Sequence, residues 1–267
     1  MNNQAVIVVP LYKEIPSAYE ELALEQCFKI LGDFKIVAIK PYSLSLQPYN
    51  FNFDEVISFD DSFFADVAGY NKLMLSSSFY ETFLAYEFML LYQPDALVFK
   101  DELSFWCNQG YDYLGAPWLK SRAYSNLFKQ TKNDAIRYIY TKFNIKQSNS
   151  DLPSDKQFQN RVGNGGLSLR NIKKFNQVCH EKKQVIEFYN SRSEYYFGED
   201  VFWSVEANRD KTYLNIPDAK VAIRFSIEQS IDYAIQLNNG ELPFGCHAWD
   251  RDVKIWKPYF RKAGIEI

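Results

Sequence analysis

The segment Phe88-Met-Leu-Leu-Tyr-Gln-Pro-Asp95 decides the fold class of this chain. Its first five residues are all apolar, which is typical of a strand that is covered on both faces of a sheet. Asp95 follows directly, at the carboxyl end of the strand, where open α/β sheets bind their ligands. An unpaired carboxylate buried there would cost on the order of several kcal/mol. We therefore expect Asp95 to have a partner, and a divalent cation is a natural one.

Strand and helix patterns alternate along the first hundred residues. Strands are predicted at 5–9, 35–39, 55–59 and 88–92, and helices at 17–32 and from Tyr70 to about Tyr86. Ser17 and Glu20 have the spacing of a capping box, which predicts the start of the first helix. Beyond the middle of the chain, a strand is predicted at 166–169 and helices at 172–188 and 199–208. This order predicts an α/β fold with a mostly parallel central sheet flanked by helices.

The composition predicts one globular domain in a reducing environment. The 267 residues are 47% hydrophobic and carry a formal net charge of −3, so nucleic acid is not expected as a partner. The four cysteines form no CxxC pair, which favours a cytoplasmic protein, and no apolar run is long enough to cross a membrane. The segment from about 120 to 161 is rich in Lys, Asn, Gln and Ser. It is predicted to be a surface insertion with one helix, which either covers a site or is inert.

Polar residues follow each predicted strand of the amino-terminal half. They are Pro10, Tyr12 and Glu14 after the first strand, Lys40 after the second, Asp60 after the third, and Gln93 with Asp95 after the fourth. Carboxyl ends of parallel strands meet at one edge of a sheet, so these residues are expected to converge there. The alternative is a set of ordinary solvated turns.

Three motifs in the carboxyl-terminal half are candidates for a site. In Val162-Gly-Asn-Gly-Gly166 the glycines would allow positive φ and a close approach of the backbone to a ligand, and Asn164 suits sugar hydroxyls, although a plain tight turn explains the motif equally. Glu199 and Asp200 begin a predicted helix, so one of them is a candidate general base, while the helix dipole alone also explains them. His247 lies in a turn rich in glycine and aromatic residues, where a ligand role competes with a structural one.

Together these residues resemble a nucleotide-sugar glycosyltransferase of the GT-A fold. Val9-Pro-Leu-Tyr-Lys-Glu14 resembles the opening Val-Pro-x-Tyr-Asn-Glu of the largest GT-A family, and Gln93-Pro-Asp95 occupies the place of the Asp-x-Asp motif. Gly163-Asn-Gly-Gly166-Leu-Ser resembles a Gly-Gly-Phe-Ser loop, and Glu199-Asp200 resembles the Glu-Asp pair of inverting members. Order and spacing over nearly the whole chain also resemble an uncharacterised bacterial family described as glycosyltransferase-like.

The resemblance implies a Rossmann-like, GT-A-like sheet and assigns roles to residues. Residues 1–100 would form the nucleotide-binding half, and 101–267 the acceptor and catalytic half, of one domain. Donor-binding residues would be Pro10, Tyr12, Glu14, Asp60, Asn71, Lys72 and Gln93, and sugar or acceptor contacts would come from Asn164, Gly165, Gly166 and Trp203. Glu199 or Asp200 would be the catalytic base. Because Gln93 replaces the first acid of the motif, binding of Mn²⁺ or Mg²⁺ would depend on Asp95 and His247.

The implied reaction is transfer of a sugar from a nucleotide-diphosphate sugar, uridine-linked, to a glycan or to a lipid- or protein-linked acceptor, with inversion. One alternative is a sugar nucleotidyltransferase, although the glycine-rich basic loop that such enzymes carry after the first strand is absent. Another is a non-catalytic nucleotide- or sugar-binding module. The tail 253–262 mixes basic and aromatic residues, which suits either contact with the inner face of a membrane or docking on the protein. Pro258 is expected to interrupt a long helix there.

Overall fold

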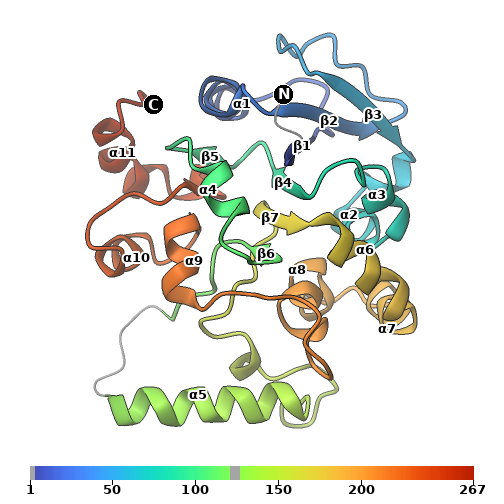
Figure 1. The fold of residues 1–267 in the computed structure, drawn as a ribbon, viewed down its shortest axis with the longest axis vertical. Helices are drawn as coiled ribbons and strands as arrows, with labels where there is room; N and C mark the ends of the chain where they lie inside the picture. Colours follow the sequence, from blue (N-terminus) through green and yellow to red (C-terminus); the bar gives the residue numbers. More distant parts are fainter. Residues whose placement is uncertain (1–3, 121–126) are drawn as a thin grey trace.

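The computed structural model describes residues 4–120 and 127–267, and a six-stranded sheet forms its centre (Figure 1). The strands follow the order β3-β2-β1-β4-β7-β6. Their bounds are β1 Ala5–Pro10, β2 Lys35–Pro41, β3 Glu55–Phe59, β4 Phe88–Tyr92, β6 Tyr113–Leu114 and β7 Leu167–Asn171. The first four are parallel, whereas β7 runs antiparallel to both β4 and β6. The predicted α/β fold with a mostly parallel sheet is confirmed.

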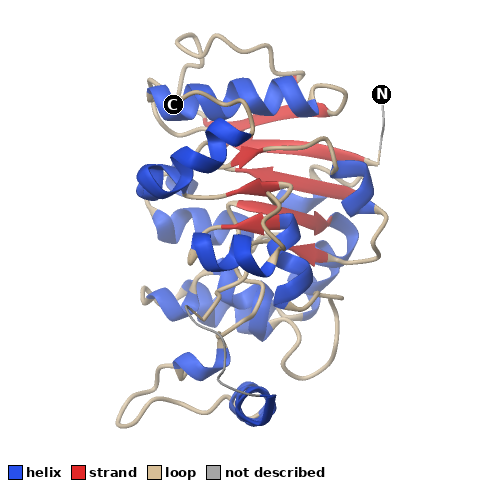
Figure 2. Ribbon diagram, turned by 90° about the vertical axis from the view of Figure 1, so that its left-hand side faces the viewer, coloured by secondary structure: helices blue, strands red, loops and turns tan. Residues whose placement is uncertain are grey.

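Helices cover both faces of this sheet (Figure 2). On β4, Leu91 packs with the cluster that contains residues of helices α2, α3, α6 and α7, and Leu90 packs with the cluster that contains residues of α1 and α4. Neighbouring residues of a strand point to opposite faces, so the continuous apolar run of β4 is explained by burial on both sides. The bounds are α1 Ala18–Leu31, α2 Val67–Met74, α3 Ser77–Glu81, α4 Leu103–Cys107, α6 Ile172–Glu181 and α7 Lys183–Asn190.

The start of α1 is as predicted from the capping box. The Glu20 backbone N–H donates to Ser17 Oγ at 3.3 Å, and the Ser17 N–H donates to Glu20 Oε2 at 2.7 Å. A second bond links Glu20 to Lys13 Nζ at 2.7 Å, so the loop after β1 is fastened to the first turn of α1. This contact places Lys13 near the sheet edge where β1 ends.

Three predicted helices are interrupted. The helix expected at 70–86 is divided into α2 and α3 because Ser76 is extended and its Oγ caps α3, accepting from Phe79 N–H at 3.2 Å. The helix expected at 172–188 breaks at Lys182, whose buried Nζ donates to the Glu206 carbonyl at 3.2 Å. The segment 199–208 contains one α-turn, α8 at Glu199–Val201, followed by a π-helical turn at Phe202–Glu206.

A second, three-stranded sheet and three helices form the carboxyl-terminal side. The strands are β5 Leu97–Val98, β8 Ser226–Ile227 and β9 Gly245–Cys246, and the helices are α9 Ala219–Phe225, α10 Ile231–Leu237 and α11 Val253–Lys262. The tail is docked on the protein, because Trp256 and Phe260 of α11 are fully buried. The expected interruption at Pro258 is wrong, since α11 continues through it.

The middle segment forms one long helix, α5 Leu127–Lys142, which lies along one end of the molecule (Figure 1). It is the one helix predicted for this insertion, and it contacts the 3₁₀ turn Asp155–Gln157. In the described ranges, no helix has the length and apolar character needed to span a membrane.

Candidate functional site

A cleft of about 810 Å³ lies at the sheet edge where β1 and β4 end. The loop formed by residues 163–166 directly precedes β7, and we call it the glycine loop. Because β7 is antiparallel to β4, with Tyr92 opposite Leu167, this loop reaches the same edge. The Gln93 N–H donates to the Gly166 carbonyl at 2.8 Å and joins the two loops. Eleven of the residues proposed from the sequence line the cleft: Pro10, Tyr12, Asn71, Gln93, Asp95, Asn164, Gly165, Gly166, Glu199, Asp200 and His247.

Five other residues proposed from the sequence do not line it, and one of them is Lys40, whose Nζ donates to the Pro41 carbonyl at 3.2 Å. Glu14 and Lys72 are exposed outside the cleft, and Asp60 is exposed at the end of β3, where it caps the 3₁₀ turn Asp61–Phe63. Hydrogen bonds from Ser62 hold the pKa of the Asp60 carboxyl below its usual value. Trp203 is fully buried within the core, so its ring presents no surface to a sugar. Its π-helical turn points it inward.

The glycine loop allows two functional side chains to approach the backbone. A Cβ atom at Gly165 would lie 2.2 Å from Glu199 Oε1, and one at Gly166 would lie 1.8 Å from His247 Nε2. Glycines with positive φ in the described ranges are Gly110, Gly240 and Gly264, so the expectation of positive φ in this loop is wrong. The loop needs glycine because these side chains occupy the space that a Cβ would take.

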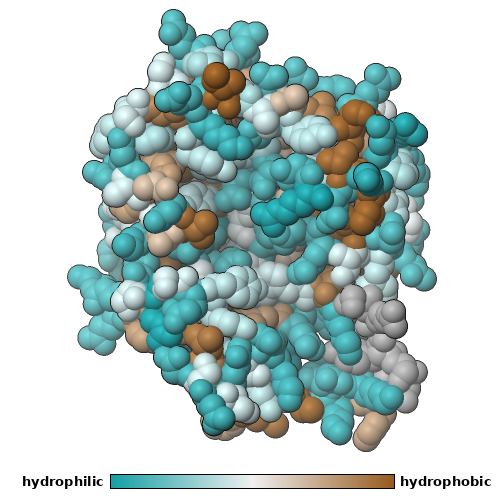
Figure 3. All heavy atoms as spheres, turned by 180° about the vertical axis from the view of Figure 1, so that it is seen from behind, coloured by the Kyte–Doolittle hydropathy of each residue, from teal (hydrophilic) through white to brown (hydrophobic). Residues whose placement is uncertain are grey.

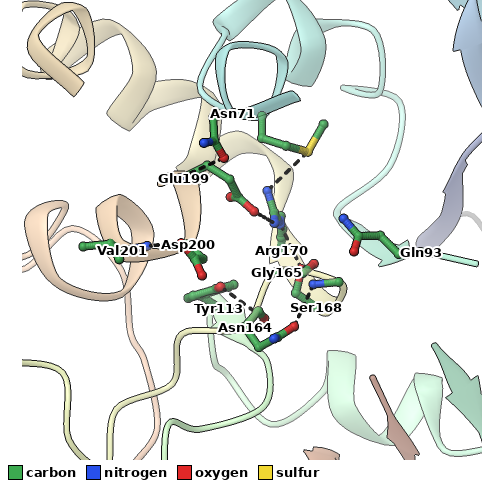
Figure 4. A network of polar contacts seen from close by, with 12 residues as sticks. Asn71, Gln93, Tyr113, Asn164, Gly165, Ser168, Arg170, Glu199, Asp200 and Val201 are labelled. Carbon is green, nitrogen blue, oxygen red and sulfur yellow. Dashed lines mark hydrogen bonds and ion pairs between the residues drawn. The ribbon is translucent and has the colours of Figure 1, made fainter. Parts of the chain in front are cut away.

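Glu199 is held in a buried ion pair with Arg170 of β7 (Figure 4). Arg170 Nη2 lies 3.2 Å from Glu199 Oε1, while Nη1 donates to Tyr80 Oη and Nε to Ser168 Oγ, each at 3.0 Å. The Glu199 N–H also donates to Asn71 Oδ1 at 3.2 Å. Glu199 is therefore fixed in position and charge-paired.

Arg170 was missed by the sequence-based reasoning, although a signal was present. In Leu167-Ser-Leu-Arg170 the two leucines face one side of the sheet, so serine and arginine must both face the other. An arginine on a covered face of a central strand is fully buried and requires a partner. Neither the identity of that partner nor its distance follows from the spacing.

Asp200 differs from its neighbour because no basic side chain pairs with it among the described residues. Within residues 4–120 and 127–267, its Oδ1 accepts only from the Val201 N–H, at 2.8 Å, and the side chain lines the cleft. Burial, together with the nearby charge of Glu199, raises the pKa of Asp200 to about 8. Once ionised, a carboxyl group with this pKa is a stronger base than an ordinary aspartate, which suits proton transfer near neutral pH.

His247 forms the opposite end of the site. Its Nε2 lies 3.1 Å from Asp95 Oδ1 and 3.0 Å from Gln93 Oε1, and its Nδ1 lies 3.6 Å from Glu228 Oε1. Burial opposes protonation, but the hydrogen bonds and charges of Asp95 and Glu228 prevail and raise the pKa of His247 to about 9. Glu228, at the end of β8, was not singled out in the sequence because nothing nearby marked it.

The donor atoms at this end fit a divalent cation in part. Two ligand atoms at adjacent octahedral positions around Mg²⁺, each about 2.1 Å from the ion, lie roughly 3 Å apart. Asp95 Oδ1 and Gln93 Oε1 each have this separation from His247 Nε2. No group of three His, Cys, Asp or Glu residues in the described ranges suits a metal ion, so water or substrate oxygens would have to complete the shell.

Two buried polar atoms on residues that line the cleft, Tyr70 Oη and Glu199 Oε2, have no hydrogen-bond partner among the described residues. A third, His247 Nδ1, has the ion pair with Glu228 Oε1 at 3.6 Å and no shorter contact there. Buried polar atoms in folded proteins are nearly always paired, so such a group at one cleft indicates a site built to receive a polar ligand.

Comparison with known proteins identifies a family and a fold. The model of a family described as "Protein of unknown function (DUF5672)" matches residues 54–247. No curated protein matches the chain. Among solved structures, the galactosyltransferase LgtC in complex with donor and acceptor sugar analogues is 14% identical, with a TM-score of 0.55 over 97% of this chain and 95% of that one. This likeness confirms the predicted GT-A fold.

Two further solved structures are similar at lower scores. Mouse xyloside xylosyltransferase 1 is 11% identical, with a TM-score of 0.49 over 91% of this chain and 97% of that one. The glycosyltransferase GlyE of Streptococcus pneumoniae is 11% identical, with a TM-score of 0.46. The match covers 92% of this chain and 55% of GlyE.

Proposed function

We propose that this chain, which belongs to the DUF5672 family, is a glycosyltransferase. It would move a sugar from a nucleoside-diphosphate sugar, uridine-linked, to a hydroxyl group of a glycan or a lipid- or protein-linked acceptor, with inversion. The observation that carries the proposal is the pair Glu199 and Asp200, of which the first has an arginine partner and the second has none among the described residues. The other end of their cleft holds Asp95 and His247. One end suits acceptor activation, and the other suits a diphosphate.

Asp200 is the proposed base. Glu199 is fixed by Arg170, whereas Asp200 lines the cleft with a pKa near 8. A base must be deprotonated to accept the hydroxyl proton, so the acceptor oxygen becomes nucleophilic as Asp200 takes it up. In Figure 4, Asp200 and Gln93 lie on opposite sides of the glycine loop. Attack from the Asp200 side, with departure of the diphosphate toward Gln93, inverts the anomeric carbon.

The donor diphosphate would lie beside His247 and Asp95. Lys13, which lines the same cleft, would offer positive charge to the phosphates, and a protonated His247 would do so when no cation is bound. Asp95, His247 and the amide oxygen of Gln93 would hold Mn²⁺ or Mg²⁺, which when bound supplies Lewis-acid stabilisation of the departing diphosphate. Because His247 would need to lose its proton to bind the cation, metal affinity is expected to rise with pH.

The decisive experiment measures release of UDP from a panel of UDP-sugars, with and without acceptor hydroxyls. Asp200→Asn should lower turnover by about 10²-fold or more, because it removes the proton acceptor and keeps the shape. In the native protein, kcat/KM should rise with pH up to about 8, the pKa of Asp200. Asp250→Asn is the matched control, since Asp250 also lines the cleft and has no role in this mechanism.

The outcomes separate the candidate functions. Full turnover by Asp200→Asn would refute the assignment of the base. UDP that raises the melting temperature without turnover of any UDP-sugar would indicate a binding module, whereas formation of a UDP-sugar from UTP and a sugar phosphate would indicate a nucleotidyltransferase.

The metal proposal has its own measurement. Mn²⁺ added with UDP should raise the melting temperature above the value with UDP alone, and Asp95→Ala should remove that increment. An unchanged increment in Asp95→Ala would exclude Asp95 from the metal site.

A further inference from the structure

Helix α5 presents its apolar side to the outside of the molecule. Phe128, Tyr138, Ile139 and Phe143 are 77%, 65%, 46% and 73% exposed. With exposed Ala135, the first three share one side of the helix, because residues separated by three, four or seven positions lie on the same face. Phe143 directly follows the last residue of α5, and its N–H donates to the Ile139 carbonyl at 3.0 Å, so it continues this side. An ordinary surface helix has the opposite arrangement, with its apolar side toward the core.

The inward side of α5 is polar and fixes the helix in this orientation. Arg137 pairs with Asp134 at 3.0 Å and donates from Nη1 to the Gln159 carbonyl at 3.1 Å. The buried Thr141 accepts at Oγ1 from Arg161 Nη2 at 3.2 Å, and its carbonyl accepts from Arg209. These contacts attach α5 to residues 159–161, which precede the glycine loop, and to Arg209, so rotation of the apolar side inward would break a buried polar network.

Basic residues outnumber acidic ones in α5 and the four residues that follow it. Residues 127–146 contain five basic residues (Lys129, Lys132, Arg137, Lys142 and Lys146) and one acidic residue, Asp134. Asp134 is paired with Arg137 on the inward side, whereas Lys129 and Lys132 are exposed. An apolar face bordered by lysines suits the surface of an anionic bilayer, where aromatic side chains enter the headgroup region and lysines meet lipid phosphates.

We propose that the outward face of α5 binds the surface of an anionic membrane. This face is Phe128, Lys132, Ala135, Tyr138, Ile139 and Phe143. A second copy of the chain is a poorer occupant, because two such faces would bring like charges together. The proposal does not depend on sugar transfer.

The tail exposes fewer apolar side chains than α5 does, so α5 is the proposed membrane contact. The aromatic residues Trp256 and Phe260 of α11 are fully buried, and Ile255 is only 40% exposed. The end of the molecule that carries α5 has hydrophobic atoms at its surface in Figure 3, near the lower edge. The structure thus offers a larger apolar area on α5 than on the tail.

The test is co-sedimentation of the full chain with vesicles of phosphatidylcholine, alone or mixed with phosphatidylglycerol. We expect binding to the mixed vesicles that weakens as salt increases. Phe128→Ser/Phe143→Ser should lower the partition coefficient by about 10-fold or more, because two largely exposed rings no longer enter the interface. Lys132→Glu should lower it by about fivefold or more, and only on anionic vesicles.

Ile255→Ser on α11 is the matched control and should bind as the native chain does. All substituted side chains are exposed, and unchanged melting temperatures will show that the variants fold. Undiminished binding by Phe128→Ser/Phe143→Ser would overturn the proposal, as would equal binding to neutral vesicles. A dimer in solution that Phe128→Ser/Phe143→Ser dissociates, with no vesicle binding, would overturn it in favour of a second copy as the occupant.

Discussion

The ion pair between Arg170 and Glu199 provides a sharp test of how the site is held. Replacing Arg170 with methionine keeps most of the side-chain volume and removes the charge. Glu199 is 5% exposed and would lose its one basic partner in the described ranges, at 3.2 Å, while its Oε2 has no partner to compensate. A buried carboxylate left in this way has no favourable interaction to offset its lost hydration.

The expected loss of unfolding free energy follows from the burial of both partners of the ion pair. Arg170 is 0% exposed, so neither charge can recover its hydration when the other is removed. Removing one partner of a buried pair costs about 3–5 kcal/mol, and Arg170→Met and Glu199→Gln should each fall in this range. In Arg170→Met/Glu199→Gln both charges are gone, so its loss should be smaller than the sum of the single losses by about 2 kcal/mol or more.

Urea unfolding followed by tryptophan fluorescence measures each free energy of unfolding. Ser168→Ala is the control, because it removes one hydrogen bond of Arg170 and leaves the ion pair, and should cost about 1 kcal/mol. Additive losses in the double variant would show that the two charges do not interact, and the account of Glu199 given above would then be wrong.

Two further predictions concern Asp200 and the glycine loop. Between about pH 4 and pH 8 the Asp200 carboxyl stays protonated in the folded state, because of its raised pKa, and ionises in the unfolded state, so the unsubstituted protein loses stability as pH rises. Asp200→Asn removes this loss. The variant should therefore be more stable than the unsubstituted protein by more than about 1 kcal/mol at pH 8, and equally stable near pH 4. An equal difference at both pH values in thermal unfolding would contradict the raised pKa. Gly166→Ala should lower stability by about 1–3 kcal/mol because its Cβ would overlap the His247 ring, and adding His247→Ala should recover part of the loss. No recovery would show that the alanine disturbs something other than this contact.

The central sheet could be predicted from the sequence because its signals are local. The run 88–92 is continuous and apolar, and the capping box at Ser17 and Glu20 needs only four residues. The convergence of Tyr12, Gln93 and Asp95 at one cleft follows from the parallel order of the strands. Where parallel strands fix the position of a residue, spacing in the sequence is sufficient information.

The errors arose where distant side chains decide the structure. Helix periodicity continues across Ser76 and Lys182, but a capping hydroxyl and a bond to the Glu206 carbonyl interrupt the helices there. Trp203 follows the acidic pair closely in the sequence, yet a π-helical turn places it in the core. Asp60 follows β3 at the edge of the sheet, where it caps a turn instead of reaching the cleft.

The acidic pair shows most clearly what the sequence could and could not supply. Adjacent Glu199 and Asp200 were expected to differ, because successive helical residues point in different directions. The direction of the difference depends on Arg170, which is 29 positions away and reaches Glu199 from the middle of the sheet. Burial and the charge of Glu199 raise the pKa of Asp200, whereas the positive charge of Arg170 lowers it. The arginine that holds one acid in place therefore acts against the raised pKa of the other, and burial together with the neighbouring glutamate outweighs it.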